Sequence, residues 1–223
     1  MVTSKMRIFK PTTASGRQTV TPFTRKEVDD IRLLCKQRRD RANNSKVKKT
    51  VNPHWSDKYL WDRNYMLIDL GVNTALRIED LVQIRVNDQI KRGYVDTFEF
   101  KTGRNKPFQL NPRITKELND FIERNHLITG EYLFTSRTGF NKPMTRQQSH
   151  SMIRGLADEL GIVRKIGCHS LRKTFGKLYY ESTNDLVGLH RMLHSGKGDP
   201  TVTLIYIGMV DDEISRKRKG FDI

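Results

Sequence analysis

Apolar side chains recur at every third or fourth position through most of the chain, which is the spacing of one face of an α-helix. This pattern predicts helices at residues 24–35, 61–72, 77–84, 111–122, 145–160, 169–180, 184–193 and 199–206. Residues 24–27 and 145–148 have the spacing of a capping box, and Asn111-Pro112 places a cap residue before proline at the first helical position. The sequence therefore predicts a mostly helical protein.

One segment follows a different period. From Tyr94 to Lys101 apolar and polar residues alternate, and the alternation resumes at Phe108. Residues 102–105, Thr-Gly-Arg-Asn, have the composition of a turn. We expect a β-hairpin with Lys101 beside its tip, so the predicted fold class is α+β, mostly helical, with a small antiparallel sheet.

Composition limits the class of protein. The chain has 223 residues, of which 36% are hydrophobic, which suits one compact domain with a short arm. We expect a soluble, cytoplasmic protein, because no apolar run has membrane-spanning length and no apolar leader begins the chain. Cys35 and Cys168 are far apart, which predicts two reduced thiols rather than a disulfide framework or a zinc site.

Charge points to a polyanionic partner. Lysine and arginine total 41 against 25 acidic residues, a net charge of +16, and each phosphate that such residues neutralise releases counterions. Many of these cations lie in residues 36–58, which are either a solvated linker or a flexible contact to the DNA backbone. The candidate DNA-binding residues are Arg38, Arg39, Arg41, Lys46, Lys48, Lys49 and, at the hairpin, Arg104.

Four separate features could carry chemistry. Arg77 stands at a predicted helix start ahead of two carboxylates, and Lys101 stands on the hairpin. His169 and Arg172 share one helix face, and His194 precedes a short helix that carries Tyr206. Each feature alone also has an ordinary explanation: a surface arginine, a lysine at a turn, a structural histidine and a core aromatic residue.

The order of these features resembles the tyrosine recombinase family, also called the phage integrase family. The resemblance covers about residues 22–210. It is carried by five segments: TALRIEDL, FKTGRNK, HSLRKTF, MLHSG and TVTLIYIG. It implies the fold of a tyrosine recombinase catalytic domain and a DNA strand-exchange reaction through a covalent 3′-phosphotyrosyl intermediate.

The resemblance also implies a role for each residue. Arg77 and Arg172 would bind the scissile phosphate, His194 would donate a further hydrogen bond, and Asp80 would orient Arg77. Tyr206 would be the nucleophile.

Two residues would move protons. His169 would act as an acid and base toward the nucleophile, and Lys101 would protonate the leaving 5′ oxygen. No metal, ATP or other cofactor is expected, because cationic side chains would stabilise the transition state.

The sequence departs from the family pattern in places. Ala75 and Leu193 replace usual glycines, and Lys173 replaces a common second histidine. Residues 196–199 look inserted and lengthen the spacing to Tyr206, so His190 is a minor rival to His194.

The resemblance extends to organisation and partners. It implies a short recombinase without a separate core-binding domain, or a fragment of a longer one. A flexible basic arm at 1–20 would precede a catalytic domain at 21–210, which contains a basic insertion at about 36–58. A tail at 211–223 would contact another protomer. The expected partners are double-stranded DNA with an inverted-repeat core site and three further copies of the chain, which would be a monomer when free. We also expect accessory DNA-bending factors and a location at the nucleoid of a bacterial host.

Three other functions remain open from the sequence. They are a DNA-binding relative without catalysis, a type IB topoisomerase-like enzyme and a basic RNA-binding protein. The last lacks an aromatic RNA-binding motif.

Overall fold

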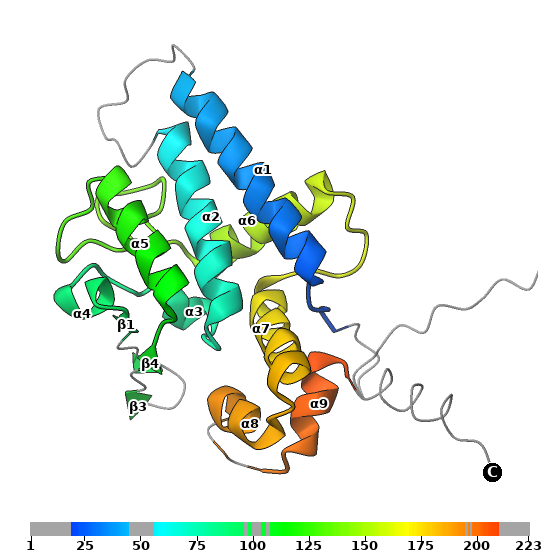
Figure 1. Ribbon diagram of the computed structural model, residues 1–223. Helices are drawn as coiled ribbons and strands as arrows, with labels where there is room; N and C mark the ends of the chain where they lie inside the picture. Colours follow the sequence, from blue (N-terminus) through cyan, green and yellow to red (C-terminus); the bar gives the residue numbers. More distant parts are fainter. Residues whose placement is uncertain are drawn as a thin grey trace, which may run out of the picture.

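The structure, a computed structural model, describes residues 19–44, 56–95, 98–99, 104–105, 108–194, 196 and 198–209 (Figure 1). Its helices are α1 (Arg25–Asn44), α2 (Asp57–Asn73), α3 (Ile78–Leu81), α4 (Asp88–Lys91), α5 (Pro112–Arg124), α6 (Arg146–Glu159), α7 (Cys168–Thr183), α8 (Leu186–His194) and α9 (Thr201–Ile207). Its strands are β1 (Tyr94–Val95), β2 (Phe98–Glu99), β3 (Arg104–Asn105) and β4 (Phe108–Gln109). The prediction of a mostly helical α+β fold is confirmed.

Three of the predicted helix starts are confirmed in detail. Thr24 and Glu27 exchange hydrogen bonds at the start of α1, and Thr145 and Gln148 do so at the start of α6. Asn111 caps α5, accepting a hydrogen bond from the third residue of that helix. Local side chains therefore satisfy backbone N–H groups that no helical carbonyl can reach.

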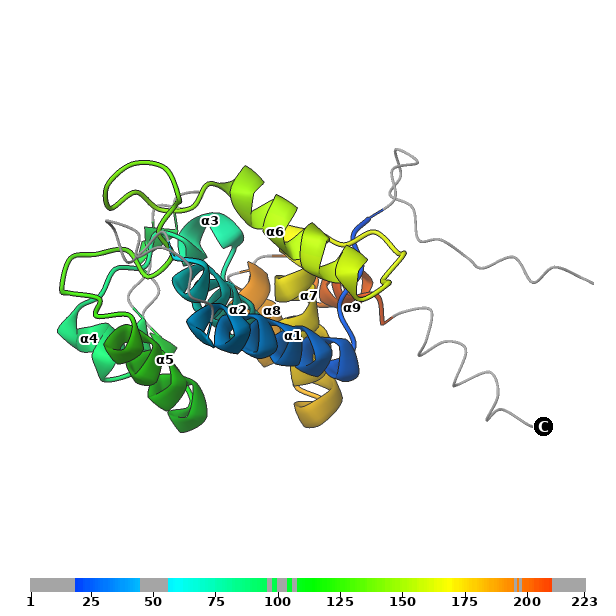
Figure 2. The same ribbon diagram turned by 90° about the horizontal axis from the view of Figure 1, so that it is seen from above.

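Helix α2 runs through the centre of the molecule. Helices α1, α5 and α7 pack against it, and α6 lies on the side of α2 away from α5 (Figure 2). The sequence pattern predicted one apolar face, including Tyr65 and Ile68, but nearly the whole circumference is buried. Asp62 and Asp69 are among the fully buried residues, so α2 carries two carboxylates into the core.

The first buried carboxylate, Asp62, joins α1, α2 and α5. It accepts hydrogen bonds from Arg39 at 3.0 Å, from Arg124 at 3.1 and 3.2 Å, and from Asn125 at 2.6 Å. Burial raises the pKa of Asp62, but the bonds from Arg124, Asn125 and Arg39 outweigh it, so the pKa lies below its usual value. Removing this carboxylate would leave two guanidiniums without their common partner.

The second buried carboxylate, Asp69, repeats the arrangement two turns along α2. It pairs with Arg32 of α1 and accepts two hydrogen bonds, at 3.0 and 3.1 Å, from Arg113 of α5. The two acidic positions thus fix α1 and α5 along the length of α2.

The basic segment is not a linker over its first part. Helix α1 continues to Asn44, because Arg38 and Arg39 find partners on neighbouring helices. Arg38 pairs with Glu159 and lies 5.6 Å from the ring centre of Trp61. Residues 36–44 are helical and Ser56 caps α2, whereas residues 45–55 lie outside the described residues. The predicted basic insertion at about 36–58 stays a prediction.

The predicted hairpin is present, although two residues assigned to its turn belong to a strand. Strand β1 pairs antiparallel with β4, and β2 pairs antiparallel with β3 in the same continuous register. Residues 104 and 105 belong to β3, whereas the sequence suggested that they were part of the turn. Residues 100–103, including Lys101, lie outside the described residues.

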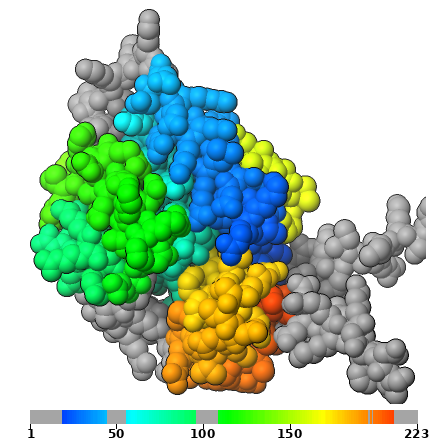
Figure 3. Space-filling model, viewed as in Figure 1, coloured from blue at the N-terminus to red at the C-terminus, as the bar shows by residue number. Residues whose placement is uncertain are grey.

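Helices α7, α8 and α9 form a unit at one end of the molecule, visible in Figure 3 as the gold and orange mass. A separate apolar cluster holds them together, centred on Leu189, Leu193, Ile207 and Met209. Gly176 of α7 lets the helices approach: a Cβ there would lie 2.7 Å from Cγ2 of Ile207 and 3.2 Å from Cδ1 of Leu193. Along the part of the chain that is described, no helix combines the length and apolar character needed to cross a membrane.

Candidate active site

Arg172 is the residue that links the parts of the site. It is buried in the first turns of α7 and donates hydrogen bonds to the carbonyl oxygens of Ala75 and Leu193. Those carbonyls belong to the segment before Arg77 and to the end of α8 beside His194. One guanidinium therefore joins three predicted motifs that are far apart in the sequence, and the two bonds fix its plane.

Arg77 occupies the N-cap position of α3 with an extended backbone, at φ −72° and ψ 152°. Its carbonyl oxygen accepts hydrogen bonds from the N–H groups of Asp80 and Leu81. Asp80, three residues further on in α3, is buried. That placement is consistent with the predicted orienting role of Asp80, which stays a prediction.

His169 lies at the exposed start of α7, next to the ion pair between Arg146 and Glu79, which are 3.0 Å apart. Desolvation by surrounding protein lowers the pKa of His169. Glu79 opposes this effect, and the charges of Arg146 and Arg172 add to it. The imidazole is thereby biased toward its neutral form, which can accept a proton.

Tyr206 lies on α9, partly buried against the α7–α8–α9 unit. The ring of His194 meets it edge-on, with centroids 5.6 Å apart and an interplanar angle of 85°. Burial raises the pKa of Tyr206, while the charges of Arg172 and Arg77 act in the opposite direction. The phenol is therefore protonated at rest, with two arginines close enough to favour its anion.

The structure distinguishes the two candidate histidines of α8. His194 contacts Tyr206, whereas His190 is buried behind it, with Nδ1 2.9 Å from Oγ1 of Thr203. Burial lowers the pKa of His194, and neighbouring His190, Arg172 and Arg77 lower it further. The Nε2 atoms of both histidines are buried without a hydrogen-bond partner among the described residues, so it is the contact with Tyr206 that favours His194.

The site also contains a residue to which the sequence assigned no role. Lys173 follows Arg172 on α7, is buried, and places its Nζ 5.2 Å from the centre of the Tyr206 ring. The only sequence signal was that a lysine stands where the family commonly has histidine. Its neighbours could not be read from the sequence, because they come from α9.

The predicted DNA-binding cations fall into three groups. Arg41 is exposed at the end of α1, and Arg38 is partly exposed beside Glu159. Arg39 points to Asp62 inside the protein, and its guanidinium is paired with that carboxylate rather than exposed for DNA. The side chains of the remaining candidates, Lys46, Lys48, Lys49 and Arg104, lie outside the described residues.

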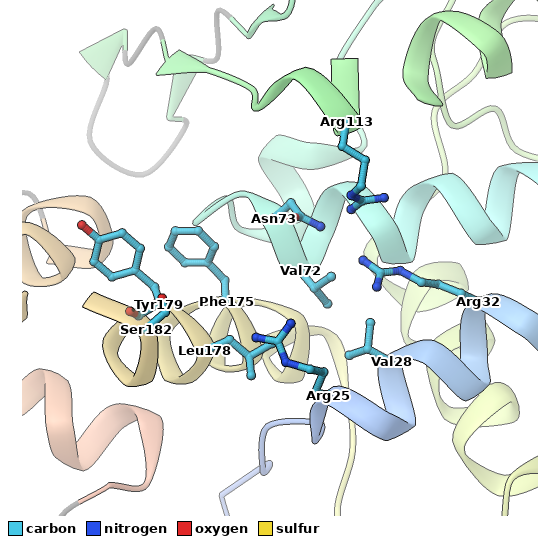
Figure 4. A pocket seen from close by; sticks show the side chains of 10 residues that line it. All are labelled: Arg25, Val28, Arg32, Val72, Asn73, Arg113, Phe175, Leu178, Tyr179 and Ser182. Atoms are coloured by element: carbon cyan, nitrogen blue, oxygen red, sulfur yellow. Dashed lines mark hydrogen bonds between the residues drawn. The ribbon is translucent and has the colours of Figure 1, made fainter. Parts of the chain in front are cut away.

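A separate pocket of about 320 Å³ lies between α1, α2, α5 and α7 (Figure 4). Arg25, Arg32, Arg113 and Asn73 give it a polar side, and Phe175 adds an apolar wall. None of the residues predicted to be catalytic lines it. No group of three or more potential metal-ligating side chains, histidine, cysteine or acidic, occurs in the described ranges.

Known proteins that are similar to this chain belong to one family. The model of the phage integrase family matches residues 40–207. A probable integrase/recombinase, YoeC of Bacillus subtilis, is 33% identical over 160 residues, which are 71% of this chain and 84% of YoeC. Tyrosine recombinase XerD of Listeria innocua is 26% identical over 65% of this chain; the chain spans about half, 49%, of that relative's length.

A solved structure shares the fold. XerH site-specific recombinase, captured with its palindromic difH substrate in a post-cleavage complex, matches 93% of this chain with a TM-score of 0.64 at 16% identity. The match covers 55% of the XerH chain.

Proposed function

Because the chain belongs to the phage integrase family of tyrosine recombinases, we propose that it is a site-specific DNA recombinase with Tyr206 as its nucleophile. The observation that carries the proposal is the meeting of Tyr206 with His194, Arg172 and Arg77, which come from three distant parts of the chain. Packing of an aromatic residue in the core does not by itself explain two guanidinium charges so near its hydroxyl.

The proposed reaction is a transfer of one phosphodiester bond. The Oη of Tyr206 attacks the scissile phosphorus, and the bond between phosphorus and the 5′ oxygen breaks. The tyrosine proton passes to neutral His169, and Lys101 gives a proton to the leaving 5′ oxygen. Attack by a 5′ hydroxyl of another strand reverses these steps and reseals the DNA, so the bond energy is conserved without ATP.

The charged residues stabilise the transition state. Arg77 and Arg172 face the extra negative charge of the pentavalent phosphate, a role that guanidinium geometry suits. Arg172 is already held in its plane by two backbone carbonyls, so little reorganisation accompanies the reaction. His194 supplies a further hydrogen bond, and Asp80 supports Arg77. No metal ion is required in this scheme, and cleavage that continues in EDTA tests that point.

The proposed partner is double-stranded DNA with an inverted-repeat core site. Four copies of the chain, monomeric when free, would assemble on it with accessory DNA-bending factors, in the cytoplasm at the nucleoid. Arg38, Arg41, Arg104 and the lysines of the basic segment would contact the backbone, together with the arm at 1–20. The tail at 211–223 would join neighbouring protomers.

Trapping on a nicked suicide substrate tests the proposal. Wild-type protein should form a denaturation-resistant complex with DNA, and Tyr206→Phe should form none while binding DNA nearly as well. Arg172→Ala and Arg77→Ala should each cleave ~100-fold more slowly, the usual loss for one preorganised donor. A covalent complex from Tyr206→Phe would refute the assignment, and none from wild type would indicate a DNA-binding relative without catalysis.

A further inference from the structure

Lys173 is a buried cation close to the nucleophile. It is 8% exposed, and no carboxylate lies within salt-bridge distance of it among the residues that the structure describes. Burying an ammonium group is costly, and here burial lowers the pKa of Lys173. An apolar side chain would fill the same position at less cost, so the charge itself calls for an explanation.

The group that faces this charge is an aromatic ring. The Nζ of Lys173 lies 5.2 Å from the centre of the Tyr206 ring, within the range of a cation–π interaction. The π face of a ring carries partial negative charge, so the ammonium stabilises the ring where it stands.

A second contact restricts the position of the Tyr206 ring from another direction. His194 meets Tyr206 edge-on with centroids 5.6 Å apart, while Lys173 lies over the ring. The two residues come from different helices, α8 and α7, and the tyrosine from a third. The nucleophile is thus held from two sides, on a helix of only seven residues.

We propose that Lys173 is a positioning residue for the nucleophile: its ammonium group holds the Tyr206 ring so that the hydroxyl is presented to the scissile phosphate. Lys173 acts on the ring and not on the reacting phosphate. This inference rests on the proposed recombinase function and extends it to a residue outside the family's usual catalytic set.

Three variants separate charge from packing. Lys173→Met keeps the length and loses the charge, and Lys173→Arg keeps the charge. Lys177→Met is the matched control, because Lys177 lies one turn further along α7 and faces Glu181 at 3.9 Å. The half-site dissociation constant and the single-turnover cleavage rate at saturating DNA are measured for each, with the melting temperature as a check on folding.

Lys173→Met should bind the half-site as wild type does and cleave about tenfold more slowly, equal to about 1.4 kcal/mol, the size of a partly desolvated cation–π contact. Lys173→Arg should recover most of the rate, and Lys177→Met should match wild type. Cleavage by Lys173→Met at the wild-type rate overturns the inference. So does weakened DNA binding with unchanged cleavage at saturation, which would make Lys173 a DNA contact.

A measurement without DNA keeps the two proposals apart. In tyrosine-labelled protein, the ring resonances of Tyr206 are identified by their absence from Tyr206→Phe. They should shift in Lys173→Met and stay in place in Lys177→Met. If wild type forms no covalent complex, the recombinase proposal fails while this spectrum still decides whether Lys173 holds the ring; identical Tyr206 signals in wild type and Lys173→Met reject the contact.

Discussion

Replacing Gly176 with alanine should slow DNA cleavage more than it destabilises the protein. Gly176 is buried in α7 at the point where α8 and α9 pack closest. An added Cβ would lie 2.7 Å from Ile207 Cγ2, 3.2 Å from Leu193 Cδ1 and 3.7 Å from Leu189 Cδ1. Carbon atoms pack at about 3.5–4.0 Å, so α9 must move by about 1 Å to accommodate the methyl group.

The size of each effect follows from that movement. Overpacking a core costs about 1–3 kcal/mol, and replacing glycine by alanine within a helix returns about 1 kcal/mol, so the net loss of stability is about 0–2 kcal/mol. Ile207 is the residue after Tyr206, so the nucleophile moves with α9. A misplacement of about 1 Å costs about 100-fold in rate when reacting groups must align.

A control variant, with stability and cleavage measured for both proteins, separates an effect on Tyr206 from a general effect of adding a methyl group to a helix. Gly155→Ala lies on an exposed face of α6, where an added Cβ meets no heavy atom within 4 Å. It should gain about 1 kcal/mol of stability and cleave normally. Gly176→Ala should keep its affinity for half-site DNA and lose about two orders of magnitude in single-turnover covalent-complex formation. Wild-type cleavage by Gly176→Ala would refute the claim that close packing at this glycine positions Tyr206.

Other predictions concern stability, pH and assembly. Asp62→Asn should lower the free energy of unfolding by about 3–5 kcal/mol in urea titrations, because it removes the common partner of two guanidiniums, whereas Asp30→Asn, in an exposed pair, should change it by less than about 1 kcal/mol. Folding lowers the pKa of His169 and His194, so the unfolded chain binds more protons in mild acid. The free energy of unfolding should therefore fall as pH drops below about 6.5, and the double substitution to glutamine should flatten that slope. Deleting residues 211–223 should spare half-site binding and abolish cooperative filling of the full site in gel-shift titrations; a truncated protein that still fills paired sites cooperatively would exclude a role for the tail between protomers.

Local sequence determined three of the helix starts. The capping pairs at Thr24 and Thr145, and the Asn-Pro step at Asn111, act within one helical turn, so their geometry follows from residues three positions apart or fewer. The ordered set of catalytic candidates was also visible, because the identity and order of residues along a chain need no knowledge of its folding.

Tertiary structure alone decided which side chains meet. Pattern analysis predicted an amphipathic α2, but arginines of α1 and α5 allow two aspartates to be buried on it. The contacts of His194 and Lys173 with Tyr206 depend on how α8 and α9 pack against α7. Arg172 reaches carbonyls 97 and 21 residues away along the chain. No periodicity encodes such distances, because they result from the packing of the whole core, and the site exists only once that packing is complete.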